Sequence, residues 1–571
     1  MATLPIGDQS GVVEERAWFK HYEATVPRHI DYPKVALQRF LFESARRFPD
    51  RYAVYYFGAR MTYRALAEET CRFANALRGL GVGKGDRVAL MMPNCPQQLI
   101  AYYGTLTAGA VAVPTNPLYV ERELQHQLAD SGAETIVLLT KFVPTLRNVI
   151  EKTRVRNVIV ANIKDYFPPI LRLLFTLAKE QKEGHRADVG GLPGVHRMSD
   201  LLQRSSAQAP DVAVAPEDLA LLQYTGGTTG VCKGAMLTHA NLVANTVQTH
   251  YWMTDLKDGE ETFMAVLPFF HVYGMTVAMN LAVMTAAMMI LQPRFEVQEV
   301  LKAIHKLRPT IFPGVPTMYV AINNHSDVQK YDLRSIRACI SGAAPLPVEV
   351  QNRFELLTGA RLVEGYGLTE AAPVTHCNPI YGHRKAGSIG TPFPDVDAAI
   401  ADLETGERGL PPGSTGELVL RGPQVMLGYW NNPEETRQAL REGWLYTGDI
   451  AKYDEDGYFY ITDRKKDIII AGGFNISPRE VEEVLFEHPK VREAVVVGIP
   501  DQYRGETVKA YVVLKDGQAA TEEEIISFCR DRMARFKVPT AVEFRASLPK
   551  TMVGKVLRRV LREEEKQKLG A

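Results

Sequence analysis

The chain has 571 residues, 46% hydrophobic and 23% charged, and its 66 lysines and arginines equal its 66 aspartates and glutamates. This composition is typical of a globular protein and excludes a largely disordered chain. The balanced charge argues against a dedicated nucleic-acid-binding protein, which would usually carry a large basic excess. At roughly 150 residues per domain, the length predicts two to four domains.

Targeting signals and metal-binding patterns are not evident. The six cysteines are widely spread, with no CxxC pair, which argues against a disulfide framework or a structural zinc site and favours a reducing compartment. The first twenty residues carry acids where a secretory signal needs a basic and then an apolar segment. The most apolar stretch, 274–291, contains Asn280 and lacks basic flanks, so it predicts a buried core helix rather than a membrane span. We therefore expect a cytoplasmic protein.

The first part of the chain has an α/β pattern. From residue 62 to about 379, short β-branched runs such as 87–92 and 135–139 alternate with longer helical patterns. This alternation predicts mostly parallel, buried strands. From 382 to about 463 the pattern changes to short strands with frequent turns, which predicts a small β-barrel-like subdomain.

The charged run DRKKD at 463–467 separates this part from a shorter α+β pattern. The pattern predicts a helix at 478–487, strands at 491–497 and 508–514, and a helix at 522–532. The predicted fold class is therefore α/β, with a large N-terminal domain (1–463, including the β subdomain 382–463), a hinge (464–467) and a smaller α+β C-terminal domain (468–571).

A glycine- and threonine-rich loop follows an apolar run in LLQYTGGTTGVCKGAMLTH, residues 221–239. Glycines let backbone N–H groups approach an anion, and threonine hydroxyls and a lysine add donors to phosphate oxygens. It is not a Walker A loop, because Lys233 lies between Cys232 and Gly234, where that motif needs Gly and Ser or Thr. The loop predicts a polyphosphate site formed by Thr225, Gly226, Gly227, Thr228, Thr229, Gly230 and Lys233.

Seven further motifs follow along the chain. They are PFFHVYG (268–274), SGAAPL (341–346), EGYGLTE (364–370), GELVLRGPQVMLGYW (416–430), YTGD (446–449), DRKKDIIIAGGFNISP (463–478) and LPKTMVGKVLRR (548–559). With these motifs the sequence resembles the adenylate-forming enzymes, which include acyl-CoA synthetases, firefly luciferase and peptide-synthetase adenylation domains. It is most similar to bacterial long-chain fatty-acid-CoA ligases. The resemblance implies ATP, Mg²⁺ and coenzyme A, an acyl-AMP intermediate and a mobile C-terminal domain.

The residue types in EGYGLTE suit a nucleotide. Gly365 and Gly367 leave both sides of Tyr366 open, so that its ring can lie against adenine. Thr369 offers a hydroxyl to a phosphate, and Glu370 offers a hard carboxylate suited to Mg²⁺ carried by ATP. The resemblance adds ATP-binding positions at Gly342, Ala343, Glu364, Asp449 (on the ribose) and Arg464, and metal-binding positions at Thr225 and Glu370.

His271 follows an apolar run and precedes a glycine-containing turn. By spacing alone such a histidine is more often structural, but the resemblance places it beside the substrate carboxylate. Amino-acid-activating relatives carry an Asp just after this region, whereas FHVYGMTVAM carries no acid. A substrate ammonium would stay unpaired there, so we expect an acid without charge beyond its carboxylate. The methionines at 275, 279, 284, 288 and 289 either line an acyl tunnel or form ordinary core.

The resemblance places a catalytic cation at Lys555. An ammonium that touches carboxylate and phosphate only in the transition state lowers the barrier without tightening ground-state binding. The resemblance also implies that the C-terminal domain rotates about Lys466, which exchanges Lys555 for a coenzyme A-binding loop. That loop is Gly472, Gly473 and Phe474, where a narrow pantetheine arm would pass close to the backbone. The predicted catalytic residues are thus Lys555, His271 and Glu370.

Segment 168–182 has the pattern of an amphipathic helix. A wheel places Arg172, Thr176, Lys179 and Glu180 on one face and the apolar residues on the other. Basic neighbours favour an anionic leaflet, but a helix packed on its own domain has the same pattern. The predicted partners are therefore a fatty acid, ATP and coenzyme A, without nucleic acid. Contact with the inner face of the cell membrane and a homodimer are left open.

The predicted function is a long-chain fatty-acid-CoA ligase, which forms acyl-AMP and then a thioester with coenzyme A. One alternative is an acyl-AMP ligase that loads a carrier protein, although such relatives commonly carry an insertion near the hinge that this chain lacks. The other is a catalytically silent lipid- or nucleotide-binding module. The joint presence of Lys555, Glu370 and Asp449 argues against that module.

Overall fold

The computed structural model describes residues 16–225, 232–464, 467–471, 474–501, 504–551 and 556–568. The chain divides into two compact units. The large unit contains residues 16–397 and 421–445, and the small unit contains residues 398–420 and those from 446 onward. The predicted division into an N-terminal domain, a hinge and a C-terminal domain stays a prediction.

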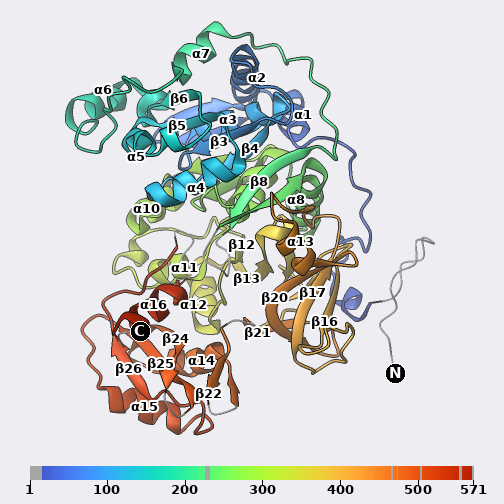
Figure 1. The fold of residues 1–571 in the computed structure, drawn as a ribbon, viewed down its shortest axis with the longest axis vertical. Helices are drawn as coiled ribbons and strands as arrows, with labels where there is room; N and C mark the ends of the chain where they lie inside the picture. The colour runs from blue at the N-terminus through green and yellow to red at the C-terminus, as the bar shows by residue number, and fades with distance from the viewer. Residues whose placement is uncertain are drawn as a thin grey trace. The chain divides into compact units, whose positions relative to one another are not determined.

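An eight-stranded sheet of order β18-β9-β8-β4-β3-β5-β6-β7 organises much of the large unit (Figure 1). Its strands are β3 (Arg87–Met91), β4 (Val111–Pro114), β5 (Thr135–Leu139), β6 (Asn157–Ala161), β7 (Val195–Arg197), β8 (Leu219–Thr225), β9 (Lys233–Thr238) and β18 (Gly428–Tyr429). The strands from β8 to β7 run parallel, whereas β9 and β18 pair antiparallel. The strands predicted at 87–92 and 135–139 are confirmed as β3 and β5.

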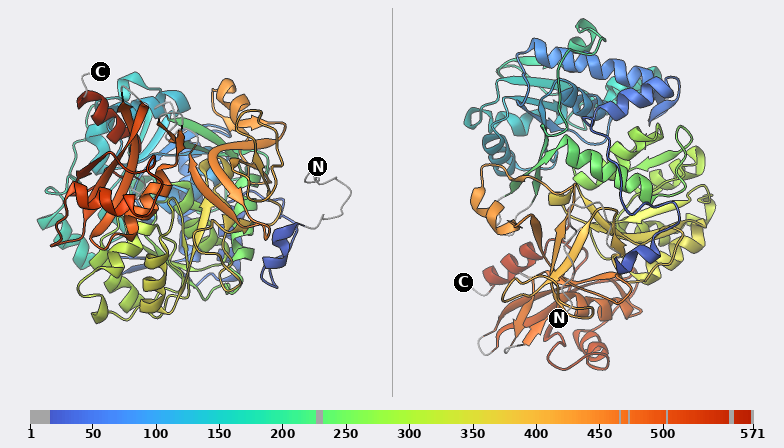
Figure 2. Two further views of the ribbon diagram at one scale, coloured as in Figure 1. Left: turned by 90° about the horizontal axis from the view of Figure 1, so that it is seen from below. Right: turned by 90° about the vertical axis from the view of Figure 1, so that its right-hand side faces the viewer.

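Helices cover this sheet, because parallel strands need long crossover connections. Leu124 and Leu128 of α4 and Leu146 of α5 pack on Ile136 and Leu138 of β5 in one buried cluster. The helix α3 is buried along its whole length and packs on α2, and the right-hand view of Figure 2 shows blue helices beside the strands of this part. The helices of this part are α1 (Arg39–Arg47), α2 (Tyr63–Gly79), α3 (Pro96–Thr107), α4 (Glu121–Ser131), α5 (Val143–Arg147), α6 (Pro169–Ala178) and α7 (Met198–Arg204).

Two four-stranded sheets complete the strand framework of the large unit, with orders β10-β11-β1-β2 and β12-β13-β14-β15. Bridges from Ile311 to Phe263 and to Ala338 connect them. Their strands are β1 (Tyr52–Tyr56), β2 (Ala59–Thr62), β10 (Thr262–Ala265), β11 (Met288–Leu291), β12 (Ala338–Ser341), β13 (Arg361–Gly367), β14 (Val374–Cys377) and β15 (Thr391–Pro392). The accompanying helices are α8 (His239–Trp252), α10 (Val297–Leu307), α11 (Pro316–Asn323), α12 (Val348–Thr358) and α13 (Pro433–Ala439).

The apolar stretch 274–291 is not one helix, which corrects the sequence prediction. It forms a π-helix (Gly274–Asn280) and α9 (Leu281–Met284), and it then becomes strand β11. Ala286 turns the chain with φ 52°. Periodicity alone cannot tell a strand buried on both faces from a buried helix, and β11 pairs in parallel with both β10 and β1. Among the described residues, no helix has the length and apolar character that crossing a bilayer requires.

The small unit contains two sheets. The first consists mainly of β16 (Asp397–Ala401), β17 (Gly416–Arg421), β20 (Trp444–Tyr453) and β21 (Phe459–Arg464), and the short β19 (Leu440–Arg441) pairs with the start of β20. The second has the order β23-β22-β25-β24 with β26 beside β25. Its strands are β22 (Ile469–Ala471), β23 (Phe474–Ile476), β24 (Val491–Asp501), β25 (Gly505–Leu514) and β26 (Ala541–Phe544).

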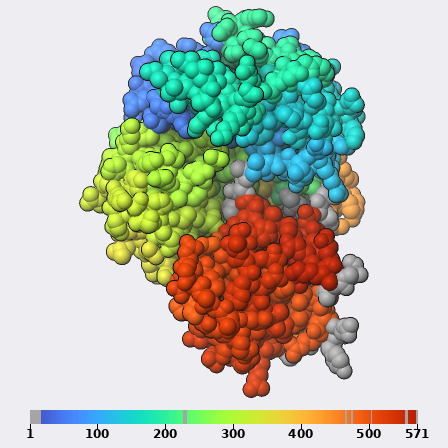
Figure 3. Space-filling view, turned by 90° about the vertical axis from the view of Figure 1, so that its left-hand side faces the viewer, coloured from blue at the N-terminus to red at the C-terminus, as the bar shows by residue number. Residues whose placement is uncertain are grey.

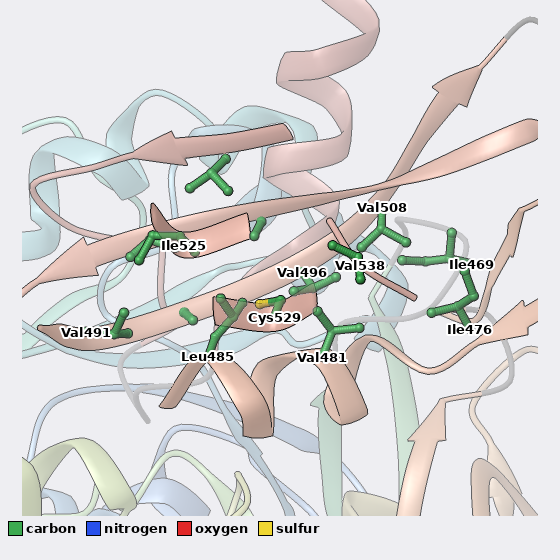
Figure 4. Packing of buried hydrophobic residues seen from close by; sticks show 14 of the residues in the cluster. Ile469, Ile476, Val481, Leu485, Val491, Val496, Val508, Ile525, Cys529 and Val538 are labelled. Carbon is green, nitrogen blue, oxygen red and sulfur yellow. The ribbon is translucent and has the colours of Figure 1, made fainter. Parts of the chain in front are cut away.

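The helices of the small unit are α14 (Pro478–Glu487), α15 (Glu522–Arg530) and α16 (Arg558–Lys568). Val481 and Leu485 of α14 pack with Ile525 and Cys529 of α15 over the second sheet (Figure 4). All four elements predicted for this part of the chain are confirmed. The predicted α/β class, with mostly parallel sheets in the larger part and a smaller α+β part at the C-terminal end, is also confirmed.

Candidate active site

The predicted phosphate loop connects two paired strands. β8 ends at Thr225 and β9 begins at Lys233, and these two residues are register partners. Gly226, Gly227, Thr228, Thr229 and Gly230 lie outside the described residues. The Lys233 side chain is only 10% exposed and forms an ion pair with Glu435. Its ammonium also lies 5.3 Å from the ring centroid of Tyr429, so two groups from a distant part of the sequence hold this cation.

Glu370 lies in the short 3₁₀ helix Thr369–Ala371 that follows β13. Its Oε1 accepts a hydrogen bond of 2.7 Å from the hydroxyl of Tyr429, and its carbonyl accepts one of 2.8 Å from the N–H of Met426. Burial, and then the charge of Glu370, raise the pKa of Tyr429. Segment 426–430 therefore touches both Lys233 and Glu370. Sequence analysis missed Tyr429 and Glu435, although Tyr429 stands in the matched motif GELVLRGPQVMLGYW.

The residues of EGYGLTE occupy the end of β13. Ser341 of β12 pairs in parallel with Glu364, which brings the predicted Gly342 and Ala343 beside this strand. Glu364 is buried, and its Oε2 accepts from the N–H of Leu346 at 3.1 Å. Ala343 has φ 67°, an uncommon conformation for a residue other than glycine and one that is often found at functional sites.

The two glycines beside Tyr366 have a packing role. A Cβ at Gly367 would lie 2.0 Å from the carbonyl oxygen of Pro373, and one at Gly365 would lie 3.0 Å from Cγ2 of Ile340. The Tyr366 ring meets the His376 ring edge-on, with centroids 6.0 Å apart. The glycines thus allow neighbouring chain segments to approach β13 closely, whatever room they also leave for a nucleotide.

Two buried amides hold the segment that precedes His271. Asn94, 1% exposed, donates to the carbonyls of Ala265 (3.1 Å) and Leu267 (2.8 Å) and accepts from the N–H of Phe269 (2.8 Å). Gln223, near the end of β8, donates to the carbonyl of Phe270 at 3.0 Å. These four backbone positions end one residue before His271. Neither Asn94 nor Gln223 was identified from the sequence, because only long-range contacts give them this role.

His271 itself has a defined tautomer when neutral. Its Nδ1 accepts the N–H of Tyr273 at 3.3 Å, so the proton of the neutral ring resides on Nε2. The Tyr273 hydroxyl donates to the carbonyls of Ile340 (2.8 Å) and Gly314 (3.2 Å), which ties the histidine turn to the strand before Gly342.

These contacts gather most of the predicted site in the large unit. Its members are Thr225, Lys233, His271, Gly342, Ala343, Glu364, Gly365, Tyr366, Gly367, Thr369 and Glu370. The cation, the carboxylate and the imidazole are the groups needed to bind a polyphosphate and a second anion next to it.

Asp449 and Arg464 belong to the small unit, where they are register partners in β20 and β21. Asp449 is 4% exposed, and its N–H donates to Thr447 Oγ1 at 3.1 Å. The preceding Gly448 has φ 73°, and its N–H donates to Glu417 Oε1 at 3.0 Å. These residues lie inside β20, and the side chains of Glu417 and Thr447 hold two successive backbone N–H groups of that strand.

The remaining predicted residues lie at or in gaps of the described chain. Lys466, Gly472, Gly473 and Lys555 are outside the described residues, and Phe474 begins β23. Ion pairs join Asp467, which borders the gap at 465–466, to Arg558, which lies just after the gap at 552–555, and Arg558 to Glu482.

Three side chains carry this connection. Arg558 Nη2 donates to both carboxylate oxygens of Glu482, each at 2.7 Å, and its Nη1 lies 3.5 Å from the carboxylate of Asp467. Burial raises the pKa of Glu482, and Arg558 opposes that shift.

Comparisons with known proteins show the family to which the chain belongs. The family described as AMP-binding enzyme matches residues 41–430, and the AMP-binding enzyme C-terminal domain matches residues 480–555. A long-chain-fatty-acid-CoA ligase of Bacillus subtilis (strain 168) is 49% identical over 553 residues, which cover 96% of this chain and 98% of the relative. A protein of the same description from Escherichia coli O6:H1 is 41% identical over 567 residues, covering 97% and 99%.

Solved structures give the same result. An anthranilate CoA ligase in complex with anthranoyl-AMP is 28% identical with a TM-score of 0.83, covering 95% of this chain and 99% of its own. A long-chain-fatty-acid-CoA ligase from Archaeoglobus fulgidus is 29% identical with a TM-score of 0.67, covering 92% and 99%.

Proposed function

The chain belongs to the AMP-binding enzyme family, and from that premise we propose that it is a long-chain fatty-acid-CoA ligase. It activates a fatty acid with ATP to acyl-AMP and then transfers the acyl group to the thiol of coenzyme A. The observation that carries this proposal is that Lys233, Glu370 and His271 all belong to the large unit. Glu435 pairs with Lys233, Tyr429 bonds to Glu370, and Gln223 holds the backbone just before His271. The identity of 49% with one curated ligase over nearly the full chain supports the long-chain substrate.

The donor set at Glu370 fits a metal that arrives with its nucleotide. Within the described ranges, no group of three or more His, Cys, Asp and Glu residues could hold a metal ion by itself. Mg²⁺ that is carried by ATP needs only one or two carboxylates, since phosphate oxygens and water complete its coordination. Glu370, with the hydroxyl of Thr225, would hold Mg²⁺. When bound, this ion would neutralise charge on the leaving pyrophosphate.

The protein groups divide the first half-reaction among them. Lys233 and the loop before it bind the polyphosphate, and Asp449 binds the ribose. The Nε2–H of His271 donates to one oxygen of the fatty carboxylate and turns its other oxygen toward the α-phosphorus. Lys555 neutralises the charge that develops as the two anions meet.

The second half-reaction uses a different set. Rotation about Lys466 replaces Lys555 by residues 472–474, and the thiolate of coenzyme A attacks the acyl carbonyl with AMP as leaving group. The thiol proton is released to solvent as the thiolate forms, and the products are a thioester and AMP, so atoms and charge balance without a further reactant.

A substrate panel tests this proposal. Purified protein is mixed with ATP, Mg²⁺ and saturated fatty acids of increasing chain length, with and without coenzyme A, and products are identified by mass spectrometry. We expect AMP and acyl-CoA, with the highest kcat/KM for long chains. Acyl-AMP that reacts only with a carrier protein would favour the acyl-AMP ligase, and the absence of pyrophosphate release would favour a silent binding module.

The Lys555→Ala variant separates the two half-reactions. It should lower pyrophosphate–ATP exchange by about 100-fold or more and leave thioester formation from supplied acyl-AMP close to wild type. An equal loss in both assays would contradict the assigned role of Lys555.

We further propose that α6 contacts the membrane from which fatty acids are taken. Ile170, Leu173 and Leu177 are 77%, 60% and 77% exposed, and segment 163–185 lies at the surface (teal in Figure 3). The predicted wheel needs one correction. Glu180 lies beyond the end of α6, where it is buried and pairs with Lys164, so it does not belong to an exposed polar face of this helix.

Vesicle sedimentation tests this contact. The double variant Leu173→Gln/Leu177→Gln should bind less to anionic vesicles, whereas Leu356→Gln, at a leucine 87% exposed on α12, serves as the matched control. Equal binding of all three proteins would refute a role for α6. The homodimer stays a prediction.

A further inference from the structure

We propose that Tyr429 is a positioning residue that holds Glu370 for Mg²⁺ and Lys233 for the polyphosphate at the same time. The inference rests on the roles proposed above for these two residues and adds the group that sets their relation. Tyr429 reaches Glu370 through its hydroxyl, at 2.7 Å, and Lys233 through its ring, whose centroid lies 5.3 Å from the ammonium. One rigid side chain therefore contacts both charged groups of the candidate phosphate site.

The backbone around Tyr429 is fixed independently of its side chain. Its own N–H donates to Thr436 Oγ1 at 2.9 Å, and the N–H of Trp430 donates to the carbonyl of Gly234 at 2.8 Å. Tyr429 also pairs with Ala235 in the β18–β9 ladder. Because these bonds do not involve the phenol, removing its hydroxyl should leave the strand in place.

The chemistry favours a single orientation of Glu370. A carboxylate on a flexible side chain can present either oxygen in several rotamers. The phenol donates to Oε1. Because this contact fixes the orientation of the carboxylate, it also sets the direction in which Oε2 can reach another ligand. Carboxylates that hold a metal are commonly oriented by such a donor, and removing the donor typically costs about 10-fold to 100-fold in metal affinity or activity.

Lys233 is restrained by the same residue. The ring gives the ammonium a favourable electrostatic contact, and Glu435, at 27% side-chain exposure, also forms an ion pair with it. An ammonium held in this way is already directed before the nucleotide arrives, which lowers the entropy lost on binding.

Calorimetric titration of the full-length protein with ATP, in the absence of fatty acid, tests this role without turnover. The quantity measured is the Mg²⁺-dependent gain, defined as Kd in EDTA divided by Kd with saturating Mg²⁺. Tyr429→Phe keeps the ring and should lower this gain by roughly 10-fold. Glu370→Gln should lower it further. The double variant should match Glu370→Gln alone, because the hydroxyl acts through that carboxylate.

The matched control is Tyr460→Phe, since the Tyr460 hydroxyl also donates to a carboxylate, Asp454 Oδ2 at 3.0 Å, but in the small unit. Its gain should equal that of wild type. The inference is overturned, and Tyr429 has a structural role only, in either of two cases. Tyr429→Phe weakens ATP binding equally with and without Mg²⁺, or the loss of gain in Tyr429→Phe adds to the loss of gain in Glu370→Gln. If Glu370→Gln keeps the wild-type gain, the proposed role of Glu370 fails and the inference fails with it. A wild-type gain in Tyr429→Phe alone overturns the inference but leaves the proposed function intact.

Discussion

Replacing Asn94 should slow acyl-AMP formation although Asn94 contacts no predicted substrate. Its carboxamide makes three bonds to the segment before His271. In Asn94→Leu the N–H of Phe269 and the carbonyl of Leu267 lose these partners, and each unsatisfied buried group costs about 1 to 3 kcal/mol. The two unsatisfied groups together would cost about 2 to 6 kcal/mol. The segment can avoid this cost only if its backbone moves. A displacement of about 1 Å at a reacting group can cost 100-fold in rate.

Pyrophosphate–ATP exchange with saturating fatty acid measures this effect. We expect Asn94→Leu to lower the exchange rate by about 10-fold to 100-fold, while calorimetric Kd for ATP with Mg²⁺ changes by less than about 2-fold. Asn94→Asp keeps the acceptor for Phe269 but sets a buried carboxylate oxygen against the carbonyls of Ala265 and Leu267, so it should lose at least as much. A wild-type exchange rate in Asn94→Leu would refute the reasoning, as would a loss of ATP binding that accounts for the whole effect.

Three further changes test other parts of the structure. Gly367→Ala places a methyl group against the carbonyl of Pro373. Because overpacking costs about 1 to 3 kcal/mol, it should weaken ATP binding, measured by calorimetry, by about 10-fold or more. Unchanged affinity would show that β13 adapts to the methyl group. Burial lowers the pKa of His239 to about 4, so stability is full above about pH 6.5 and falls by up to about 1.4 kcal/mol per pH unit as the pH drops toward 4. His239→Asn should therefore reduce the decrease in Tm between about pH 7 and pH 5, and an unaltered pH profile would contradict the buried neutral state. Arg558→Gln removes the guanidinium that donates to both oxygens of the Glu482 carboxylate and should destabilise the small unit by about 3 kcal/mol. Calorimetry should show a lower transition temperature, which Arg558→Lys partly restores. A wild-type transition temperature would exclude that contribution.

Local sequence patterns predicted a helix or strand correctly where nearby residues alone determine that element. The helix predicted at 478–487 has those bounds in α14, because Ser477 caps it and Pro478 suits its first turn. The apolar stretch 274–291 was predicted wrongly because its last part is a strand whose hydrogen bonds come from β1 and β10. No local signal encodes those partners.

In the candidate site, too, some residues could be predicted from local sequence and others only from contacts between distant segments. Lys233, Glu370 and His271 stand in motifs whose residue types suggest their chemistry. Tyr429 could be matched to a motif but not to a role, because its contact to Glu370 spans 59 positions in the sequence. Asn94 lies 175 positions from Phe269. Both roles depend on which strands and helices become neighbours, and that information appears only in the folded chain.

The ion pairs among Asp467, Glu482 and Arg558 have a mechanical consequence. They join the first described residue after position 466 to the first turn of α16, whose start follows residues 552–555 closely. In the proposed rotation about position 466, α16 would therefore turn together with Asp467. The proposed exchange between the two half-reactions would then depend on the backbone at that one pivot.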